Sequence, residues 1–332
     1  LWGSMAFFEQ RQKNSHAAAA KILFGEPEGS LRQALRLALS REGFEGIVDF
    51  DKSKSLREAV VKAQPDLLIL DSEMDSGAAD GMIQDIRHGR LGDNPFVPVI
   101  VTIWEPTQDV VQRVASSGTD DIMVKPLSPG QILERIRVLV RARKPFVVTS
   151  DYIGPDRRKD ESRKSDIPQI DVPNTLRSKI QGEKIDRAKL AKAIEEAQSS
   201  INDHKLKRNA FQIAFLVEVV LPEFKKREVS GALLNGLDRL LEVARDTAAR
   251  VKGTQWSHIS DLCTSLMRVT ASLRETVEQP ERKEVDLLKP LSEAIVAALH
   301  PDESSVDIAS QISNAVQGYK KRGHDRFRQR LQ

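Results

Sequence analysis

The chain has a single cysteine, Cys263, among its 332 residues. This excludes an intrachain disulfide and a cysteine-based zinc site, and it fits a reducing cytoplasm. No stretch approaches the roughly 18 consecutive apolar residues that a membrane-spanning helix needs, so we expect no membrane insertion. Aromatic residues are also scarce, at 5%, whereas charged residues make up 30%. This composition is typical of a helix-rich soluble protein rather than a β-sandwich, and the length allows two domains.

The start of the chain does not have the pattern of a signal peptide. Residues 1–5 lack a basic region followed by an apolar core, so we interpret them as a cloning remnant before a start at Met5, or as an unusual native start. Residues 1–19 as a whole are predicted to be a polar, alanine-rich lead-in.

The other end of the chain is basic. Residues 319–332 hold six Lys or Arg against one Asp, a charge of +5 that leaves −2 for the rest of the chain. We assign residues 321–332 as a basic tail. Such a tail either docks on nucleic acid or an acidic partner, or is a solubilising terminus.

One apolar run in the first half of the chain stops at a lone aspartate. Leu67-Leu68-Ile69-Leu70 follows the breaker pair Pro65-Asp66 without alternation and ends at Asp71. Such a run is typical of a strand buried on both faces of a parallel sheet. A carboxylate at the C-terminal end of such a strand lies where open α/β sheets place their chemistry.

Five repeats of an apolar strand followed by a helix with one apolar face occupy residues 20–145. The predicted strands are 21–25, 47–50, 67–71, 97–102 and 122–124. Repeats of this kind predict a doubly wound α/β fold, in which right-handed crossovers place helices on both faces of a five-stranded parallel sheet.

Four polar residues fall at the C-terminal ends of the predicted strands: Glu26, Asp71, Thr102 and Lys125. These ends meet in one crevice of a doubly wound sheet. Two carboxylates there can hold Mg²⁺, which prefers oxygen ligands. A hydroxyl and an ammonium opposite them would bind the oxygens of a transferred phosphoryl group, and Asp71 would be the nucleophile.

This set resembles the response-regulator receiver domain of two-component signalling. The resemblance covers roughly residues 20–143. It is carried by Lys21-Ile22-Leu23-Phe24 followed by acids, by Pro65 to Asp71, by Val97 to Thr102, and by Gly118-Thr119-Asp120-Asp121 with Lys125-Pro126-Leu127.

The resemblance implies a flavodoxin-like receiver that accepts a phosphoryl group on Asp71 from a histidine kinase or phosphotransfer protein. Thr102 and Lys125 would assist that transfer. Mg²⁺ would be held by Glu26, by Asp71 and by the backbone of Glu73. In the family the Lys-Pro peptide bond is usually cis.

The sequence departs from the family pattern at the metal site. Pro27 stands where the second of two adjacent acids normally binds the metal, so Glu28 would have to reach back to replace it. We therefore expect weak Mg²⁺ binding. A receiver that acts as an unphosphorylated docking module is the rival interpretation.

Other departures lie around the site. The loop after Asp71 is about two residues longer than the usual pattern, and Asp75 stands where a proline is expected. Ile122 occupies the position of the aromatic switch residue, so ring rotation there cannot report phosphorylation. Trp104, two residues beyond Thr102, either takes that part or is a partly buried surface residue.

Residues 146–173 are predicted to be a linker, because prolines and mixed charges replace the periodic apolar residues. Its apolar stretches, Phe146-Val147-Val148 and Tyr152 to Pro155, are expected to pack back on the receiver. The run Asp156 to Lys159 suggests an anion or nucleotide site, but the charge balance favours a solvated linker.

Residues 174–320 are predicted to form an all-α bundle that begins at the N-cap Asn174. Phe211 to Leu221 is apolar nearly all round, which predicts a buried central helix. From Ile259 to Leu273, apolar residues recur in alternating steps of three and four, a two-heptad seam. We expect another subunit or a partner to close this seam, with Leu266 near the contact. No family resemblance is evident in this half.

The leading interpretation is a cytoplasmic signalling protein that is not an enzyme. Its receiver, phosphorylated on Asp71, would control a helical domain that binds a protein partner or dimerises. One alternative is a transcription regulator that contacts DNA through the helical domain and the basic tail, although no basic stripe or helix-turn-helix favours it. Another is a phosphotransfer bundle acting through His258, although the adjacent Ile259 stands where sensor kinases usually have an acid.

Overall fold

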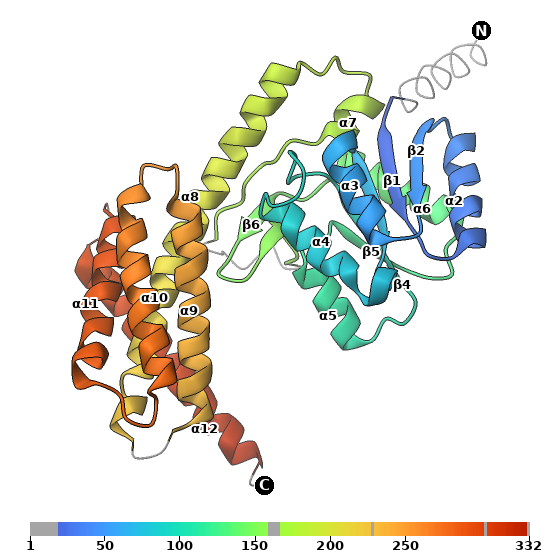
Figure 1. Ribbon diagram of the computed structural model, residues 1–332. Coiled ribbons are helices and arrows are strands. Elements are labelled where there is room, and N and C mark those ends of the chain that lie inside the picture. The colour runs from blue at the N-terminus through green and yellow to red at the C-terminus, as the bar shows by residue number, and fades with distance from the viewer. Residues whose placement is uncertain (1–18, 159–166, 227–228, 302–303, 331–332) are drawn as a thin grey trace. The chain divides into compact units, whose positions relative to one another are not determined.

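The computed structural model describes residues 19–158, 167–226, 229–301 and 304–330 (Figure 1). It divides into two compact units at Ile201 and Asn202. Nearly all of the predicted lead-in lies outside the described residues, as do the Lys and Arg side chains of the basic tail. Within the described part of the chain, no helix is long and apolar enough to cross a membrane.

The first unit is built on a five-stranded, all-parallel sheet with the strand order β2-β1-β3-β4-β5. The strands are β1 (Lys21–Gly25), β2 (Gly46–Phe50), β3 (Leu67–Asp71), β4 (Val99–Ile103) and β5 (Asp121–Val124). The helices between and after them are α2 (Gly29–Arg41), α3 (Ser53–Ala63), α4 (Ala78–Arg87), α5 (Gln108–Ser116) and α6 (Pro129–Arg141). The predicted doubly wound α/β class is confirmed.

Two helix layers bury the two faces of the sheet (Figure 1). Leu67 and Ile69 of β3 face a core shared with α2 and α6. Leu68 and Leu70 face the opposite core, shared with α3, α4 and α5. Successive side chains of a strand point to opposite faces, so a strand covered on both sides has to be apolar throughout. That is why β3 reads as an unbroken apolar run.

The register of the sheet brings the carboxyl ends of the strands together. Gly25 of β1 lies beside Leu70 of β3, and Asp71 lies beside Thr102 of β4. Strand β4 begins at Val99, two residues later than predicted. Pro98 has no backbone N–H to donate, which limits its part in a strand ladder.

Residues 146–173 contain ordered structure rather than a plain linker. Strands β6 (Phe146–Val148) and β7 (Ile153–Pro155) pair as an antiparallel hairpin, and Ile170 forms a bridge with Phe146. Phe146 is fully buried, and its ring meets that of Phe96 edge to face, with the ring centres 5.7 Å apart. These apolar stretches therefore belong to a third core of the first unit.

The prediction of a solvated linker at Asp156 to Lys159 is wrong for Asp156, whereas Arg157 and Arg158 are exposed. Asp156 is buried and accepts hydrogen bonds from Arg158 and Gln169. The bonds from Arg158 are the main reason why the pKa of the Asp156 carboxyl lies well below its usual range. Arg157 donates to the carbonyl of Thr119. Lys159 lies outside the described residues. The charges of Asp156 and Arg158 cancel, so the balanced charge of this segment in the sequence predicted a solvated linker although Asp156 is buried.

A buried ionic cluster joins this hairpin region to the sheet. The Asp120 carboxylate accepts from Arg87 at 2.9 Å and from Arg143 at 2.7 Å, and all three side chains are at least 94% buried. Both guanidinium groups also lie over the ring of Phe146, about 5 Å from its centre. Arg87 completes its hydrogen bonds with the carbonyls of Gly118, Pro95 and Val97. Such full pairing is what makes a buried charge tolerable.

The rest of the chain is helical, as the sequence predicts. Its helices are α7 (Thr175–Ile180), α8 (Arg187–Val220), α9 (Gly231–Val251), α10 (Ser260–Glu275), α11 (Arg282–Leu299) and α12 (Ser305–Arg330). Asn174 caps α7 by accepting from the backbone N–H of Arg177 at 3.1 Å. The division between units falls inside α8, later than the predicted boundary at residue 174. The reason is that Leu176, Ala197 and Ile201 pack into cores of the first unit.

The second unit has one core, which holds the predicted central helix and the seam. Phe211 to Leu221 is almost entirely within α8, and none of its residues is exposed. Leu266 is fully buried inside the single chain, where α10 packs against α9 and α11. The prediction that Leu266 lies at a subunit contact is therefore wrong. The seam is closed by helices of the same chain.

Polar groups are also buried between α8 and α9. Asn209 donates to Asp246 at 2.8 Å and to Thr247 at 3.2 Å, and Arg250 bonds the same carboxylate. Lys205 lies nearby and is 4% exposed. Burial lowers the pKa of its ammonium to about 8, although the charge of Asp246 opposes that shift.

We expect Asp120→Asn to destabilise the first unit by about 3–5 kcal/mol, because two buried guanidinium groups would lose the carboxylate that they share. Urea unfolding of the full chain measures this through Trp104, when Trp2 and Trp256 are replaced by Phe. The matched control is Asp85→Asn, whose ion pairs with Arg57 and Arg90 are partly exposed, and which should cost less than about 1 kcal/mol. Equal effects of the two substitutions would show that the buried cluster is not a major source of stability.

The lowered pKa of Lys205 predicts that the free energy of unfolding of the second unit depends on pH. Its folded pKa of about 8 lies below the ordinary 10.5, so between these values the unfolded chain binds a proton that the folded chain does not. The free energy of unfolding should rise with pH across this window, by up to about 3 kcal/mol relative to Lys205→Met. Urea unfolding followed by Trp256, with Trp2 and Trp104 replaced by Phe, measures the difference. Exposed Lys252→Met is the control, and identical pH profiles for native chain and Lys205→Met would contradict the prediction.

Candidate functional site

The four polar residues predicted to meet at one crevice do lie together at the carboxyl edge of the sheet. Asp71 is the last residue of β3, and Thr102 is the last but one of β4. Glu26 directly follows β1, and Lys125 directly follows β5. All four are buried, with at most 4% of their surface exposed. The parallel register alone places them within reach of one another.

Lys125 links the two carboxylates. Its Nζ lies 2.7 Å from Glu26 Oε2 and also forms an ion pair with Asp71 Oδ2. Two carboxylates thus share one ammonium in a buried site, which leaves a formal charge of −1 when both are ionised. Burial is the main cause of a raised pKa at Glu26, opposed chiefly by its hydrogen bond with Lys125. A site with this excess of negative charge favours a further cation.

Thr102 lies close to Asp71 without a tight hydrogen bond. Its Oγ1 is 3.4 Å from Asp71 Oδ2 and 3.5 Å from the carbonyl oxygen of Leu70. Hydroxyl hydrogen bonds are normally shorter than about 3.0 Å. The hydroxyl is therefore available for an additional acceptor placed beside Asp71.

The residues that could bind Mg²⁺ fit in kind but are few. Glu26 and Asp71 supply carboxylate oxygens, and the Glu73 N–H donates to Asp71 Oδ1 at 2.7 Å. Glu28 is exposed, and its Oε1 accepts from Ser30 at 2.6 Å, so its side chain does not reach back into the site. Among the described residues, no three His, Cys, Asp or Glu side chains are grouped as for a metal. Because Mg²⁺ often uses one or two carboxylates and keeps its waters, the donor set fits a weakly held ion.

The long loop after Asp71 is held in place by the side chain of Asp75, a contact that the sequence did not predict. Asp75 has a φ of 45°, in the left-handed region, and its carboxylate accepts from the backbone N–H of Ser53 at 2.7 Å. Bonds from Ser53 lower the pKa of Asp75. Anions are favoured at helix N-termini, and Ser53 begins α3. The aspartate at the position of the expected proline thus ties the loop to that helix.

Gly25, at the end of β1, lies close against this same loop. A Cβ built on Gly25 would lie 2.4 Å from the sulfur of Met74, which is buried in the turn after Asp71. The loop therefore packs directly against the strand that precedes Glu26.

Trp104 lies beside the ammonium group of Lys125. The Lys125 Nζ is 5.0 Å from the centre of the indole ring, and Trp104 is 44% exposed. Ile122, at the position of the missing aromatic residue, packs partly buried against the core of α3, α4 and α5. The peptide bond between Lys125 and Pro126 is cis.

A doubly wound five-stranded parallel sheet with an acid, a hydroxyl and a lysine at its carboxyl edge defines the receiver class. Residues 22–137 match the family model of the response regulator receiver domain. This part of the chain is a response regulator receiver domain, of the kind found in two-component systems.

Curated relatives match over the same length of chain. The phosphate regulon transcriptional regulatory protein PhoB of Escherichia coli (strain K12) is 28% identical over 131 residues, which are 39% of this chain and 56% of that protein. The KDP operon transcriptional regulatory protein KdpE of the same organism is 31% identical over 120 residues, 36% of this chain and 51% of that protein. The chain thus spans about half the length of these relatives. Among solved structures, chemotaxis response regulator CheY4 of Vibrio cholerae is 23% identical, with 36% of this chain and 96% of that chain covered and a TM-score of 0.32.

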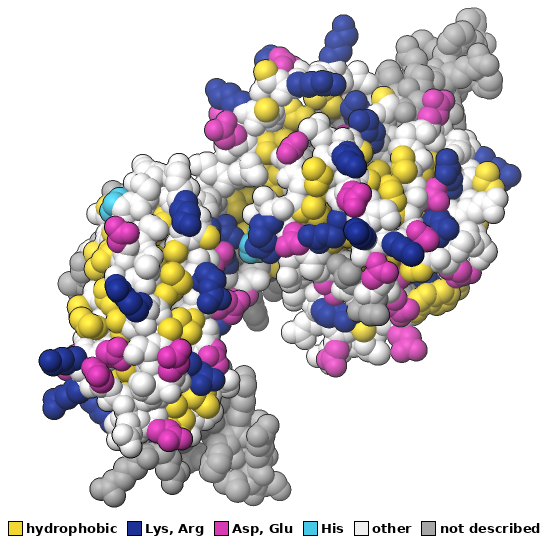
Figure 2. All heavy atoms as spheres, viewed as in Figure 1, with side chains coloured by type: hydrophobic (Ala, Val, Ile, Leu, Met, Phe, Trp, Pro, Cys, Tyr) yellow, Lys and Arg dark blue, Asp and Glu magenta, His cyan; other side chains and the backbone are white. Residues whose placement is uncertain are grey.

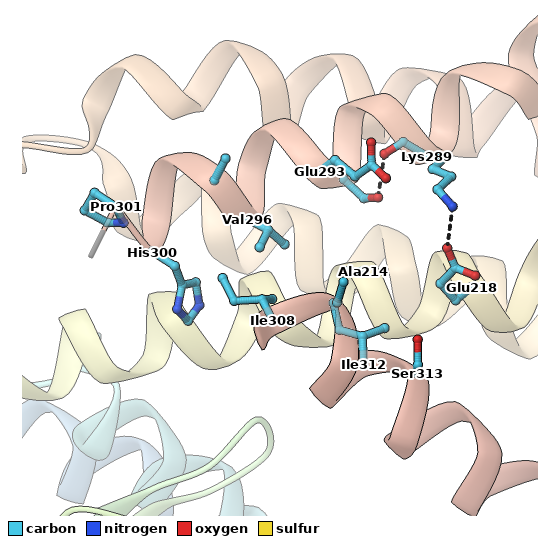
Figure 3. Close-up of a pocket in the computed structure, with 13 residues that line it drawn as sticks. Ala214, Glu218, Lys289, Glu293, Val296, His300, Pro301, Ile308, Ile312 and Ser313 are labelled. Carbon is cyan, nitrogen blue, oxygen red and sulfur yellow. Dashed lines mark hydrogen bonds and ion pairs between the residues drawn. The ribbon is translucent and has the colours of Figure 1, made fainter. Parts of the chain in front are cut away.

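The helical unit holds a separate cavity of about 570 Å³ between α8, α11 and α12 (Figure 3). Its floor is made of buried side chains, including Ala214, Val296 and Ile312. Glu218 and Lys289 form an ion pair of 3.1 Å at one end, and His300 lies at the other. His258 does not line this cavity, and it lies exposed on the short turn η3 (Ser257–Ile259) before α10.

Proposed function

We propose that this chain is a signalling protein whose receiver accepts a phosphoryl group on Asp71 from a histidine kinase or a phosphotransfer protein, and thereby controls its helical unit. The observation that carries the proposal is the buried set at the carboxyl edge, where Asp71 Oδ2 faces both Lys125 and Thr102. We propose no catalytic turnover beyond this self-phosphorylation. The cytoplasmic location stays a prediction from the single cysteine.

In the proposed transfer, a carboxylate oxygen of Asp71 attacks phosphorus, and the bond from phosphorus to the donor histidine nitrogen breaks. The electron pair of that bond leaves with the imidazole. Lys125 would neutralise charge that develops on a phosphoryl oxygen, and the Thr102 hydroxyl would donate to another. The Glu73 N–H, already bonded to Asp71 Oδ1, would hold the carboxylate in place during the attack.

Mg²⁺ would be held by Glu26 and Asp71, with the carbonyl of Glu73 as a further predicted ligand. When bound, it would neutralise the negative charge that the two carboxylates and the phosphoryl group bring together. Pro27 supplies no side-chain oxygen, so we propose weak binding.

For the helical unit we propose a protein partner rather than a second copy held by the seam. Leu266 and the rest of the seam are already packed inside one chain. Lys/Arg and Asp/Glu side chains are interspersed over the face of this unit that Figure 2 shows, and no broad basic patch is visible among the described residues of that face. This distribution does not favour DNA. PhoB and KdpE are transcriptional regulatory proteins, so a transcription regulator that contacts DNA is the alternative proposal. The second alternative is a phosphotransfer function of the helical unit through the exposed His258.

Incubating the full chain with acetyl phosphate and Mg²⁺ should add one phosphoryl group, seen by intact mass, and Asp71→Asn should abolish it because the nucleophile is gone. Asp49→Asn is the matched control. It removes an aspartate of the edge strand β2 that pairs with Arg32 and Arg36 of α2, and it should leave labelling intact.

Continued labelling of Asp71→Asn would rule out Asp71 as the acceptor. A native chain that takes no label, with or without Mg²⁺, would favour the unphosphorylated docking module instead.

The metal prediction is tested at Pro27, which is exposed beside Glu26. Pro27→Asp should tighten Mg²⁺ binding by at least about tenfold in calorimetry, because it returns a carboxylate to the site. Pro27→Ala should leave the affinity unchanged, since it removes the proline without adding an oxygen. Tight, stoichiometric binding by the native chain would show that another group already replaces the missing ligand.

A further inference from the structure

Lys125 has a third neighbour besides the two carboxylates, the indole ring of Trp104. The ammonium lies 5.0 Å from the ring centre, within the range of a cation–π contact. The side chain of Lys125 is 1% exposed, whereas Trp104 is 44% exposed. The ring therefore contacts a buried charge of the site and is exposed to solvent at the same time.

Backbone geometry keeps Trp104 beside the site. It directly follows β4, two residues after Thr102, and Ile103 pairs in register with Val124, the residue before Lys125. The two paired strands thus deliver the ring and the ammonium from adjacent positions. The contact does not depend on a long flexible loop.

The ammonium divides its interactions among Glu26, Asp71 and the ring. A phosphoryl group on Asp71 would replace one negative charge by about two. It would also bring its oxygens to the place that the Asp71 carboxylate oxygen now occupies beside Lys125. The stronger anion would draw the ammonium towards itself, and the attraction between ammonium and ring falls with distance.

We propose that Trp104 is a positioning residue for Lys125 and that it carries the charge state of Asp71 to the protein surface. This proposal rests on the proposed function, because it needs a phosphoryl group on Asp71. In the unmodified chain the ring holds the ammonium from the solvent side. After modification the ring is released from that contact, and its exposed face changes environment.

The test uses the full chain with Trp2→Phe and Trp256→Phe, so that Trp104 is the only tryptophan. Acetyl phosphate and Mg²⁺ are added, the emission of Trp104 is followed, and intact mass gives the labelled fraction of the same sample. Emission should change in proportion to the label and should stay constant in Asp71→Asn. Lys125→Met should alter the emission without any phosphodonor, because the ammonium is removed from the ring.

A second measurement separates positioning from simple packing. Trp104→Leu should slow labelling about threefold or more, whereas Trp104→Phe, which keeps an aromatic face, should label within about twofold of the native rate. Both variants should unfold at the same urea concentration as each other. Equal labelling rates for Leu and Phe would overturn the positioning role.

The outcomes distinguish this proposal from the one it rests on. Full labelling with unchanged Trp104 emission would overturn the role of Trp104 and leave phosphorylation of Asp71 standing. Absence of labelling in the native chain would overturn both.

Discussion

The central strand β3 is covered by helices on both faces, and the receiver site depends on that constraint. Because β3 lies between β1 and β4 in parallel register, its last residue has to emerge beside the ends of both neighbours. Asp71 is therefore delivered to Glu26 and Thr102 by the backbone, before any side chain interacts. Lys125 then needs only the adjacent strand β5 to reach the same point. The chemistry of the site is a consequence of strand order.

Two buried ionic clusters lie at opposite ends of the strands of this sheet. One has an excess of carboxylates and the other an excess of cations. At the carboxyl edge one ammonium, Lys125, serves two carboxylates. At the amino edge one carboxylate, Asp120, serves the two guanidinium groups of Arg87 and Arg143. The second cluster is completed by backbone carbonyls and an aromatic ring, so it suits a structural role. The first keeps an excess negative charge and a loosely bonded hydroxyl, which suit a cation and a phosphoryl group.

The helical unit buries its main apolar surfaces within the chain. The apolar residues of its seam and of its central helix are buried in one core within the chain, so they are not exposed for contact with a second copy. Its described residues also present a face of mixed charge (Figure 2) and a cavity whose floor is apolar and whose ends are polar. A partner of this unit would have to use those features. The receiver is thus joined to a helical unit that closes its own seam.

The sequence by itself determined the sheet, because unbroken apolar strands, helical spacing and turn residues are local signals. It also predicted that Glu26, Asp71, Thr102 and Lys125 lie together, since the ends of parallel strands have to meet. The apolar stretches of residues 146–155 were predicted to pack on the receiver, but only the tertiary structure decided that Asp156 is buried, because the charges of Asp156 and Arg158 cancel in the sequence. It likewise decided that Leu266 is core: a heptad pattern shows that a face is buried, but not which helix buries it. Asp75 and Trp104 acquired their partners in the same way, through contacts with Ser53 and Lys125 that are distant in sequence.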